Sequence, residues 1–201
     1  MGDENQLHAS KVFLKHRGIL RTGEAMKLGI HPRTLYRMRD EGVLVQISRG
    51  VYRLAELPEL AHPDLVAVAQ RVPRGIVCLV SALAYHEITN EVPQEVQIAL
   101  PRGTKTPVLD HPRIRIFRFS GPALSMGVEE VDLDGTKVLI YDVAKTVVDC
   151  FRFRNVIVLG VAVEALRLAL EEAEVKPSEL FRYARACRIE KVMRPYIEAM
   201  T

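Results

Sequence analysis

This chain of 201 residues has few cysteines and no long apolar run. Its positive and negative charges nearly balance. Its three cysteines are far apart and form no C-x-x-C pair, which excludes a zinc ribbon or a dithiol redox motif and favours a reducing cytoplasm. The longest stretches without a charged residue, such as GIVCLVSALAYH at 75–86, are about a dozen residues long, whereas a membrane-spanning helix needs roughly 20 apolar residues. The start, MGDENQLHAS, is polar and unlike a secretory signal. We therefore expect a cytoplasmic protein with no membrane partner.

The net charge of +3 is unevenly distributed along the chain. Residues 11–55 hold ten Lys or Arg against three Asp or Glu, a net charge of +7, so the remainder carries −4. The hydrophobic share of 48% and the charged share of 26% are those of an ordinary folded protein, and the length allows two unequal domains. A basic module beside a mildly acidic one indicates a nucleic-acid partner at the N-terminal end.

The basic segment has the spacing of a helix-turn-helix. After a short amphipathic helix at 7–16, a second helix is expected to begin at Thr22, whose hydroxyl can cap it, and to end at Gly29, where glycine adopts the left-handed exit conformation at low cost. Pro32 suits the first position of a third helix. The residues at the offsets expected of the motif are Ala25, Leu28, Gly29, Ile30, Leu35 and Met38.

The third helix and a following hairpin are predicted to contact DNA. Leu35 and Met38 face inward, which leaves the other side chains of this helix free to enter a major groove. The segment VLVQISRGVYRL at 43–54 is typical of two strands around a tight turn, and this wing carries arginines that can reach phosphate. His31 can either cap the third helix or touch a phosphate. The predicted DNA-binding residues are Thr22, His31, Arg33, Thr34, Tyr36, Arg37, Arg39, Arg49 and Arg53. The alternative is that these arginines form only a solvated helix face.

A second module is expected after the proline-containing connection AELPELAHPD at 55–64. The predicted domains are residues 1–57, a winged helix-turn-helix, and residues 62–201. In the second, a helix at 63–71 precedes GIVCLVS, a candidate buried strand, and Ser81 can cap the helix that follows. EVQIAL and RIRIFRF alternate as half-buried strands do.

The rest of the second module completes an α+β pattern. Asp134-Gly135 is a strong hairpin signal, Asp142 can cap a helix that runs to Phe153, and two or three further helices fill 156–200. The predicted class is therefore α+β: an N-terminal winged helix-turn-helix followed by a C-terminal domain with a small mixed sheet and a helical tail.

Several stretches in this order resemble the AbiEi antitoxin family. They are GVLVQISRGVYRL, VSALAYHEIT, GVEEVDLDGTKVLIYDVAKTVVDCFRF and the helical end. Members of that family are transcriptional repressors and antitoxins of type IV toxin-antitoxin and abortive-infection systems. The resemblance implies that the winged helix represses the chain's own operon by binding double-stranded operator DNA. It also implies that the C-terminal domain counteracts a nucleotidyltransferase-like toxin, with or without direct contact.

No constellation in the second module indicates catalysis, a cofactor or a metal site. Asp132 and Asp134 form a D-x-D pair, but they lie in a glycine turn, where carboxylates commonly stabilise the turn itself. Ser81 and His86 are five apart on one helix, a spacing that points them away from each other. A Gly-rich phosphate loop and an H-E-x-x-H motif are also missing from the sequence. We therefore expect a protein that is not an enzyme.

A basic stripe near the C-terminus has two interpretations. Four cations recur every three residues and would line up on a continuous helix as a partner-binding surface: Arg182, Arg185, Arg188 and Lys191. The alternative is solvated surface. Two other functions stay open as well. A one-component regulator that senses a small ligand requires a deep apolar pocket, and a DNA-processing enzyme docked by its winged helix requires converging carboxylates.

Overall fold

The computed structural model describes residues 2–201, with side chains from residue 4 onward, and the chain divides into two compact units. The first unit contains the residues up to Pro73, together with Val108–Pro112 and Asp132–Lys137. The second contains Arg74–Pro107, Arg113–Val131 and Val138–Thr201. Each unit has its own apolar core.

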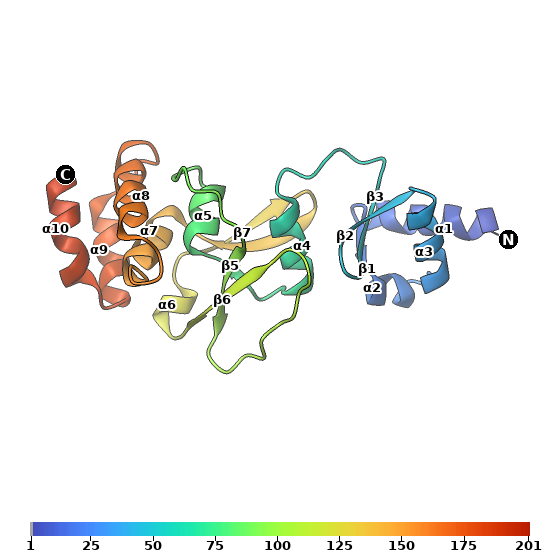
Figure 1. Cartoon of the computed structure of the whole chain (residues 1–201), viewed down its shortest axis with the longest axis horizontal. Coiled ribbons are helices and arrows are strands. Elements are labelled where there is room, and N and C mark those ends of the chain that lie inside the picture. The colour runs from blue at the N-terminus through green and yellow to red at the C-terminus, as the bar shows by residue number, and fades with distance from the viewer. Residues whose placement is uncertain (1) are drawn as a thin grey trace. The chain divides into compact units, whose positions relative to one another are not determined.

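The first unit is a winged helix-turn-helix followed by one further helix (Figure 1). Its elements are α1 (Gly2–Lys15), β1 (Ile19–Arg21), α2 (Thr22–Lys27), α3 (Pro32–Asp40), β2 (Leu44–Ser48), β3 (Val51–Leu54) and α4 (Pro63–Arg71). The strands form an antiparallel sheet in the order β1-β3-β2. The turn between α2 and α3 depends on Gly29, whose φ of +84° lies in the region that glycine adopts most readily.

The core of this unit comes from the inward faces of the three helices. Phe13 of α1, Ala25 of α2, and Leu35 and Met38 of α3 are all fully buried. The predicted inward direction of Leu35 and Met38 is confirmed. The sequence analysis placed the first helix at 7–16, but α1 begins earlier. It also gave no sign of β1, a strand of three residues that pairs with β3 and is too short to show a pattern.

The second unit is a mixed five-stranded sheet with helices, and ends in a helical tail. The strands of this sheet are β4 (Ile76–Val77), β5 (Val96–Pro101), β6 (Ile114–Phe119), β7 (Val128–Leu133) and β8 (Thr136–Tyr141), in the order β6-β5-β4-β8-β7. The adjoining ends of β7 and β8, within Asp132–Lys137, are counted with the first unit. Its helices are α5 (Leu79–Tyr85), α6 (Pro122–Ser125), α7 (Val143–Arg152), α8 (Leu159–Glu171), α9 (Pro177–Ala186) and α10 (Glu190–Met200). Figure 1 shows the last four gathered around the C-terminus. The predicted fold class is confirmed.

Two details of the second unit differ from the sequence analysis. The predicted strand GIVCLVS is a strand only at Ile76–Val77, and α5 already begins at Leu79. Ser81 is therefore inside α5, where its hydroxyl donates to the Glu95 carbonyl and accepts from the backbone N–H of Gln97, so it does not cap a helix. A short apolar run does not distinguish a buried strand from a buried helix, because both faces of either are apolar.

Candidate nucleic-acid interface

The start of α3 is fixed by His31 and Pro32. The Nδ1 atom of His31 accepts a hydrogen bond of 3.1 Å from the backbone N–H of Arg33, and Pro32 follows at the first helical position, where no amide hydrogen is needed. Of the two roles considered for His31, the helix cap is the one that the structure shows. Capping holds the first turn of α3 in a fixed direction, which is the turn that inserts deepest in helix-turn-helix proteins.

The outward face of α3 is basic and carries one aromatic ring. Arg33, Tyr36 and Arg39 are exposed, whereas Thr34 and Arg37 are half-buried. Tyr36 keeps 45% of its surface exposed, so its ring is accessible to a partner. The guanidinium of Arg39 lies over this ring, 5.6 Å from its centre.

Acidic residues at the end of α3 hold two of these arginines. Arg39 donates to the Asp40 carboxylate through Nε at 2.9 Å and through Nη2 at 2.7 Å, and this hydrogen bonding raises the pKa of Arg39. The Nε atom of Arg37 lies 3.7 Å from a Glu41 oxygen. Among the described side chains, Arg33 has no ion pair. Arg33 is thus the arginine of α3 that can contact DNA without breaking an ion pair.

The N-terminus of α2 is attached to the wing. The backbone N–H of Thr22 donates to the Gly50 carbonyl at 2.9 Å, and the Thr22 hydroxyl donates to the same oxygen at 3.3 Å. The second helix does begin at Thr22, but its hydroxyl does not cap it. Instead Glu24 accepts from the Arg21 backbone N–H at 3.1 Å and from its guanidinium at 2.7 Å, and the guanidinium lowers the pKa of Glu24.

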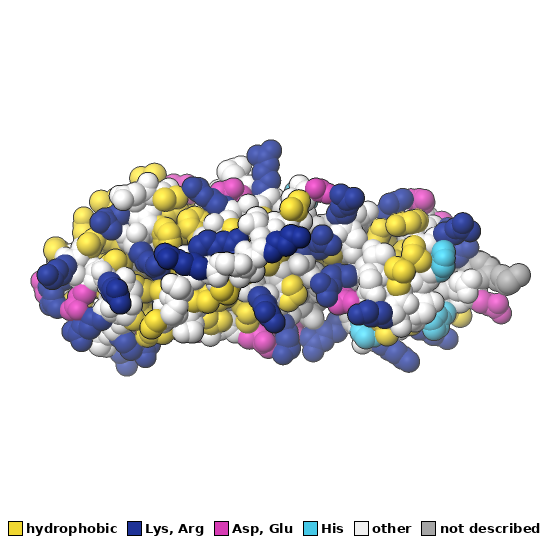
Figure 2. Space-filling view, turned by 90° about the horizontal axis from the view of Figure 1, so that it is seen from below, with side chains coloured by type: hydrophobic (Ala, Val, Ile, Leu, Met, Phe, Trp, Pro, Cys, Tyr) yellow, Lys and Arg dark blue, Asp and Glu magenta, His cyan; other side chains and the backbone are white. Residues whose placement is uncertain are grey.

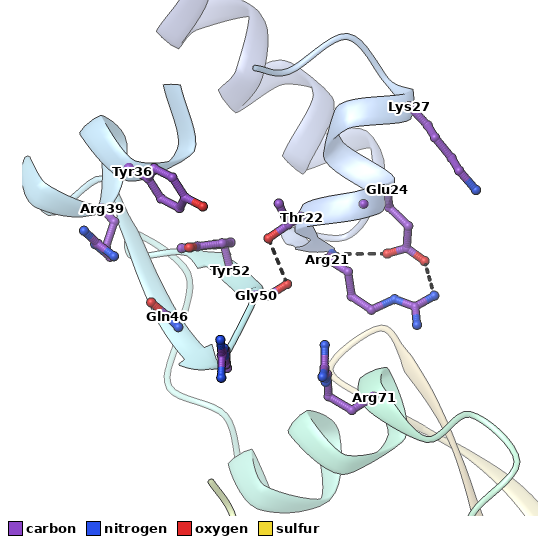
Figure 3. Close-up of a pocket in the computed structure, with 12 residues that line it drawn as sticks. Arg21, Thr22, Glu24, Lys27, Tyr36, Arg39, Gln46, Gly50, Tyr52 and Arg71 are labelled. Atoms are coloured by element: carbon purple, nitrogen blue, oxygen red, sulfur yellow. Dashed lines mark hydrogen bonds and ion pairs between the residues drawn. The ribbon is translucent and has the colours of Figure 1, made fainter. Parts of the chain in front are cut away.

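These elements surround one open cavity of about 790 Å³ within the first unit (Figure 3). Tyr36 and Arg39 of α3 form one side, with Gln46 and Tyr52 of the wing next to them, and Arg21, Thr22 and Lys27 lie on the α2 side. The full lining is Arg21, Thr22, Gly23, Glu24, Lys27, Tyr36, Arg39, Gln46, Arg49, Gly50, Tyr52 and Arg71. Five cations against one carboxylate suit a polyanion such as the phosphate backbone of DNA.

The two wing arginines of the predicted set differ in accessibility. Arg49 is exposed at the tip of the wing, where its Nη1 atom lies 3.1 Å from an Asp110 oxygen. Arg53 is only 7% exposed, and its guanidinium donates to the carbonyls of Leu57 and Pro58. The expectation that Arg53 reaches phosphate is therefore corrected: this side chain faces away from the cavity and holds the chain that leaves β3.

A comparison with protein families identifies this segment. Residues 10–55 match the family model described as "Transcriptional regulator, AbiEi antitoxin". The N-terminal segment is therefore similar to AbiEi antitoxin regulators. The matched range runs from α1 to the end of the wing, so it contains the helix-turn-helix, the β-hairpin and every residue of the predicted DNA-binding set. That description is of a transcriptional regulator, so the predicted DNA-binding residues lie in the part of the chain that is similar to such regulators.

The fold of the whole chain is shared with a solved structure. The crystal structure of the RV2827C protein from Mycobacterium tuberculosis matches with a TM-score of 0.59 and 15% sequence identity, over 96% of this chain and 80% of that chain. At this identity the similarity shows the fold alone. No curated protein matches the sequence.

The cavity residues that sequence reasoning missed lie within the same AbiEi-type segment. Tyr52 lines the cavity, whereas the sequence analysis expected its neighbour Arg53 on this strand to reach phosphate. Strand residues alternate between two faces, so the register of β3 against β1 and β2 decides which neighbour faces the cavity. Lys27 and Gln46 also line the cavity. In the sequence, the only feature that pointed to them was their location in the basic segment.

The predicted basic stripe in the second unit is not continuous. Helix α9 ends at Ala186, Arg188 has a left-handed φ of 60°, and α10 begins at Glu190. Arg182 lies over the Tyr183 ring, and Arg185 is paired with Glu190 at 2.9 Å, so these cations are already engaged. On the face seen in Figure 2, Lys and Arg side chains near the C-terminus are interspersed with apolar and acidic ones.

The candidate catalytic groups of the second module have structural partners. Asp132 accepts from the backbone N–H of Gly135 at 2.7 Å and pairs with Arg17, whose hydrogen bond lowers the pKa of Asp132. His86 Nε2 lies 2.8 Å from the Tyr141 carbonyl oxygen, away from the partners of Ser81. Within residues 4–201, no three His, Cys, Asp or Glu side chains are placed to hold a metal ion.

Two further findings bear on the other functions considered. A cavity of about 310 Å³ in the second unit is lined by His86, Tyr183 and three carboxylates besides apolar side chains, so it is not the deep apolar pocket expected of a ligand-sensing domain. Across the described part of the chain, no helix is both long and apolar enough to cross a membrane.

Proposed function

We propose that this chain is a DNA-binding transcriptional repressor that acts as the antitoxin of a type IV toxin-antitoxin system. The observation that carries the proposal is the cavity bounded by α3, α2 and the wing, where five cations and an exposed tyrosine surround one carboxylate. All of its lining residues except Arg71 lie in the segment that matches antitoxin regulators, which supports the same conclusion.

In this proposal, α3 enters the major groove and the remaining cations position the protein on the backbone. Arg33, Tyr36 and Arg37 read base edges, because they lie on the face opposite the buried Leu35 and Met38. Arg39, Arg49 and Thr22 contact phosphates, which adds affinity without sequence information. Binding over a promoter then blocks polymerase, with an affinity that falls steeply as salt rises.

In this proposal each of the two predicted domains has its own role. Residues 1–57 bind the operator, and residues 62–201 counteract a nucleotidyltransferase-like toxin encoded by the neighbouring gene. The protein needs no cofactor for either role, and it acts in the cytoplasm, where the operator DNA lies.

Substitution of the α3 arginines tests the DNA-binding half. Arg33→Ala and Arg37→Ala should each weaken binding to the chain's own promoter by about 1 to 3 kcal/mol, because each removes a contact to a base edge. A gel shift at fixed salt measures this, with Arg74→Ala as the control, since Arg74 is exposed and does not line the cavity. Full promoter affinity in the double variant would falsify the assignment of α3 as the recognition helix.

Co-expression tests the antitoxin half. The neighbouring open reading frame should arrest growth when expressed alone and should be tolerated when this chain is expressed with it. A neighbour that is harmless alone would overturn the antitoxin proposal while leaving the repressor proposal intact.

A further inference from the structure

We propose that the DNA interface extends beyond the wing to α4, and that Arg71, the last residue of α4, contacts a DNA phosphate. This inference rests on the proposed function. The segment that matches the regulator family ends at residue 55, and the predicted DNA-binding domain ends at residue 57, so neither includes this helix.

Helix α4 is fixed to the winged helix by apolar packing. Val66 is fully buried in a cluster with Ile19 of β1 and Val51 of β3, and Ile47 of the wing packs against the same cluster. Four consecutive residues of the helix, 65–68, are buried. The contact of Val66 and the burial of this middle turn fix α4, so that its last side chain, Arg71, lies at a defined position.

The side chain of Arg71 points into the cavity that α3 and the wing surround. Figure 3 shows it rising from the end of α4 towards Arg21, on the side of the cavity away from Tyr36. Arg71 is exposed and, among the described side chains, has no ion pair, whereas Arg21 is held by Glu24. The guanidinium is therefore free to pair with an anion without losing an ion pair of its own.

The position of Arg71 favours a phosphate contact over a base contact. Bases are read by the side chains of α3, which lie at the opposite side of the cavity. A duplex whose groove receives α3 exposes its backbone to the residues that flank the groove. Arg71, Lys27 and Arg49 line those flanks, so together they provide positions for successive phosphates.

Salt titration of the full chain tests this proposal. Wild type, Arg71→Gln, Arg71→Lys and the control Arg74→Gln are titrated by fluorescence anisotropy against a duplex of the chain's own promoter and an unrelated duplex, from low to moderate salt. Arg71→Gln should weaken binding to both duplexes by about threefold to tenfold and make the slope of log K against log salt shallower by about 0.9, because one phosphate contact is lost. Arg71→Lys should keep the wild-type slope, and Arg74→Gln should behave as wild type.

Three results would overturn the inference while the proposed function stands. An unchanged slope in Arg71→Gln, with binding still weakened by Arg33→Ala, would remove α4 from the interface but leave the repressor proposal standing. A loss confined to the promoter duplex would make Arg71 a base contact. A lower melting temperature with an unchanged slope would mean that Arg71 serves only the C-terminus of its own helix. If wild type fails to bind either duplex, the proposed function fails first and the inference with it.

Discussion

At the scale of single residues, neighbouring arginines of one basic sequence have different roles. Arg49 and Arg53 are four apart in the wing, yet the first is exposed at the tip and the second is buried against backbone carbonyls. Arg33 and Arg39 lie on one helix, yet Asp40 holds only Arg39. Charge counts predict that such a segment binds a polyanion, but they do not distinguish a contact residue from a structural one.

The wing arginines provide a matched prediction. Arg53→Met should lower the free energy of unfolding by about 1 to 3 kcal/mol, because two backbone carbonyls lose their buried donor, and should leave the salt dependence of DNA binding unchanged. Arg49→Ala should leave the free energy of unfolding within about 0.5 kcal/mol of wild type, and it should make the salt dependence of DNA binding shallower. Urea denaturation and anisotropy titration of the same preparations separate the two, and a shallower slope in Arg53→Met would refute the structural role.

At the scale of elements, α7 contains a buried ion pair that its sequence pattern did not reveal. Lys145 and Asp149 are both fully buried and paired, and the Lys145 ammonium lies 4.0 Å from the centre of the Tyr141 ring. Arg152 lies 4.0 Å from the same carboxylate. Burying a charge costs free energy that the opposite charge offsets. Removal of one partner leaves the other charge buried without compensation, so it should destabilise the fold more than removal of both partners.

A double-mutant cycle on α7 measures this pair. Lys145→Met should lower the free energy of unfolding by about 3 to 5 kcal/mol, because it leaves the Asp149 carboxylate buried without its main counter-ion. The double variant Lys145→Met/Asp149→Leu should recover most of that loss. Urea denaturation measures the free energy of unfolding of wild type, the single variant and the double variant. Equal losses in the single and double variants would show that packing, not charge, decides the stability of this helix.

The same pair predicts a pH dependence. Burial raises the pKa of Asp149 from 3.8 to about 6, against the opposing effect of Lys145. The folded state therefore binds a proton at a pH where the unfolded state does not, so this group's contribution to the free energy of unfolding should increase as pH falls from about 7 to about 5. The measurement compares wild type with the double variant at both values. A difference between the two proteins that does not change with pH would contradict the raised pKa.

At the scale of the whole molecule, we expect that repression and neutralisation can be separated by mutation, because each is assigned to a different domain. The AbiEi-type segment carries the predicted DNA-binding residues, and the second unit has its own core of sheet and helices. A chain with such an arrangement can lose one activity and keep the other, provided that both cores stay folded.

This separation is testable in cells. The Arg33→Ala/Arg37→Ala variant should fail to repress a reporter driven by the chain's own promoter and should still protect cells from the neighbouring gene product supplied from an unrelated promoter. Reporter output and growth are read in the same strain. Loss of protection together with loss of repression, at equal protein level, would show that neutralisation also depends on the winged helix.

The sequence by itself determined the order of the helices and of the wing in the N-terminal segment, although it did not reveal β1. Pro32 and Gly29 fix where helices begin and end through their backbone preferences, and Leu35 and Met38 fix which face is buried, because those effects act over a few neighbouring residues. The α+β class followed from alternating strands and capped helices in the same way.

Only the tertiary structure decided which of the basic residues share a surface. Arg71 joins the cavity because Val66 packs under the wing, Tyr52 replaces Arg53 there because of strand register, and Arg188 leaves the expected stripe because the backbone turns between α9 and α10. Each of these depends on contacts or backbone turns that local periodicity does not record, so charge and spacing alone could not assign them.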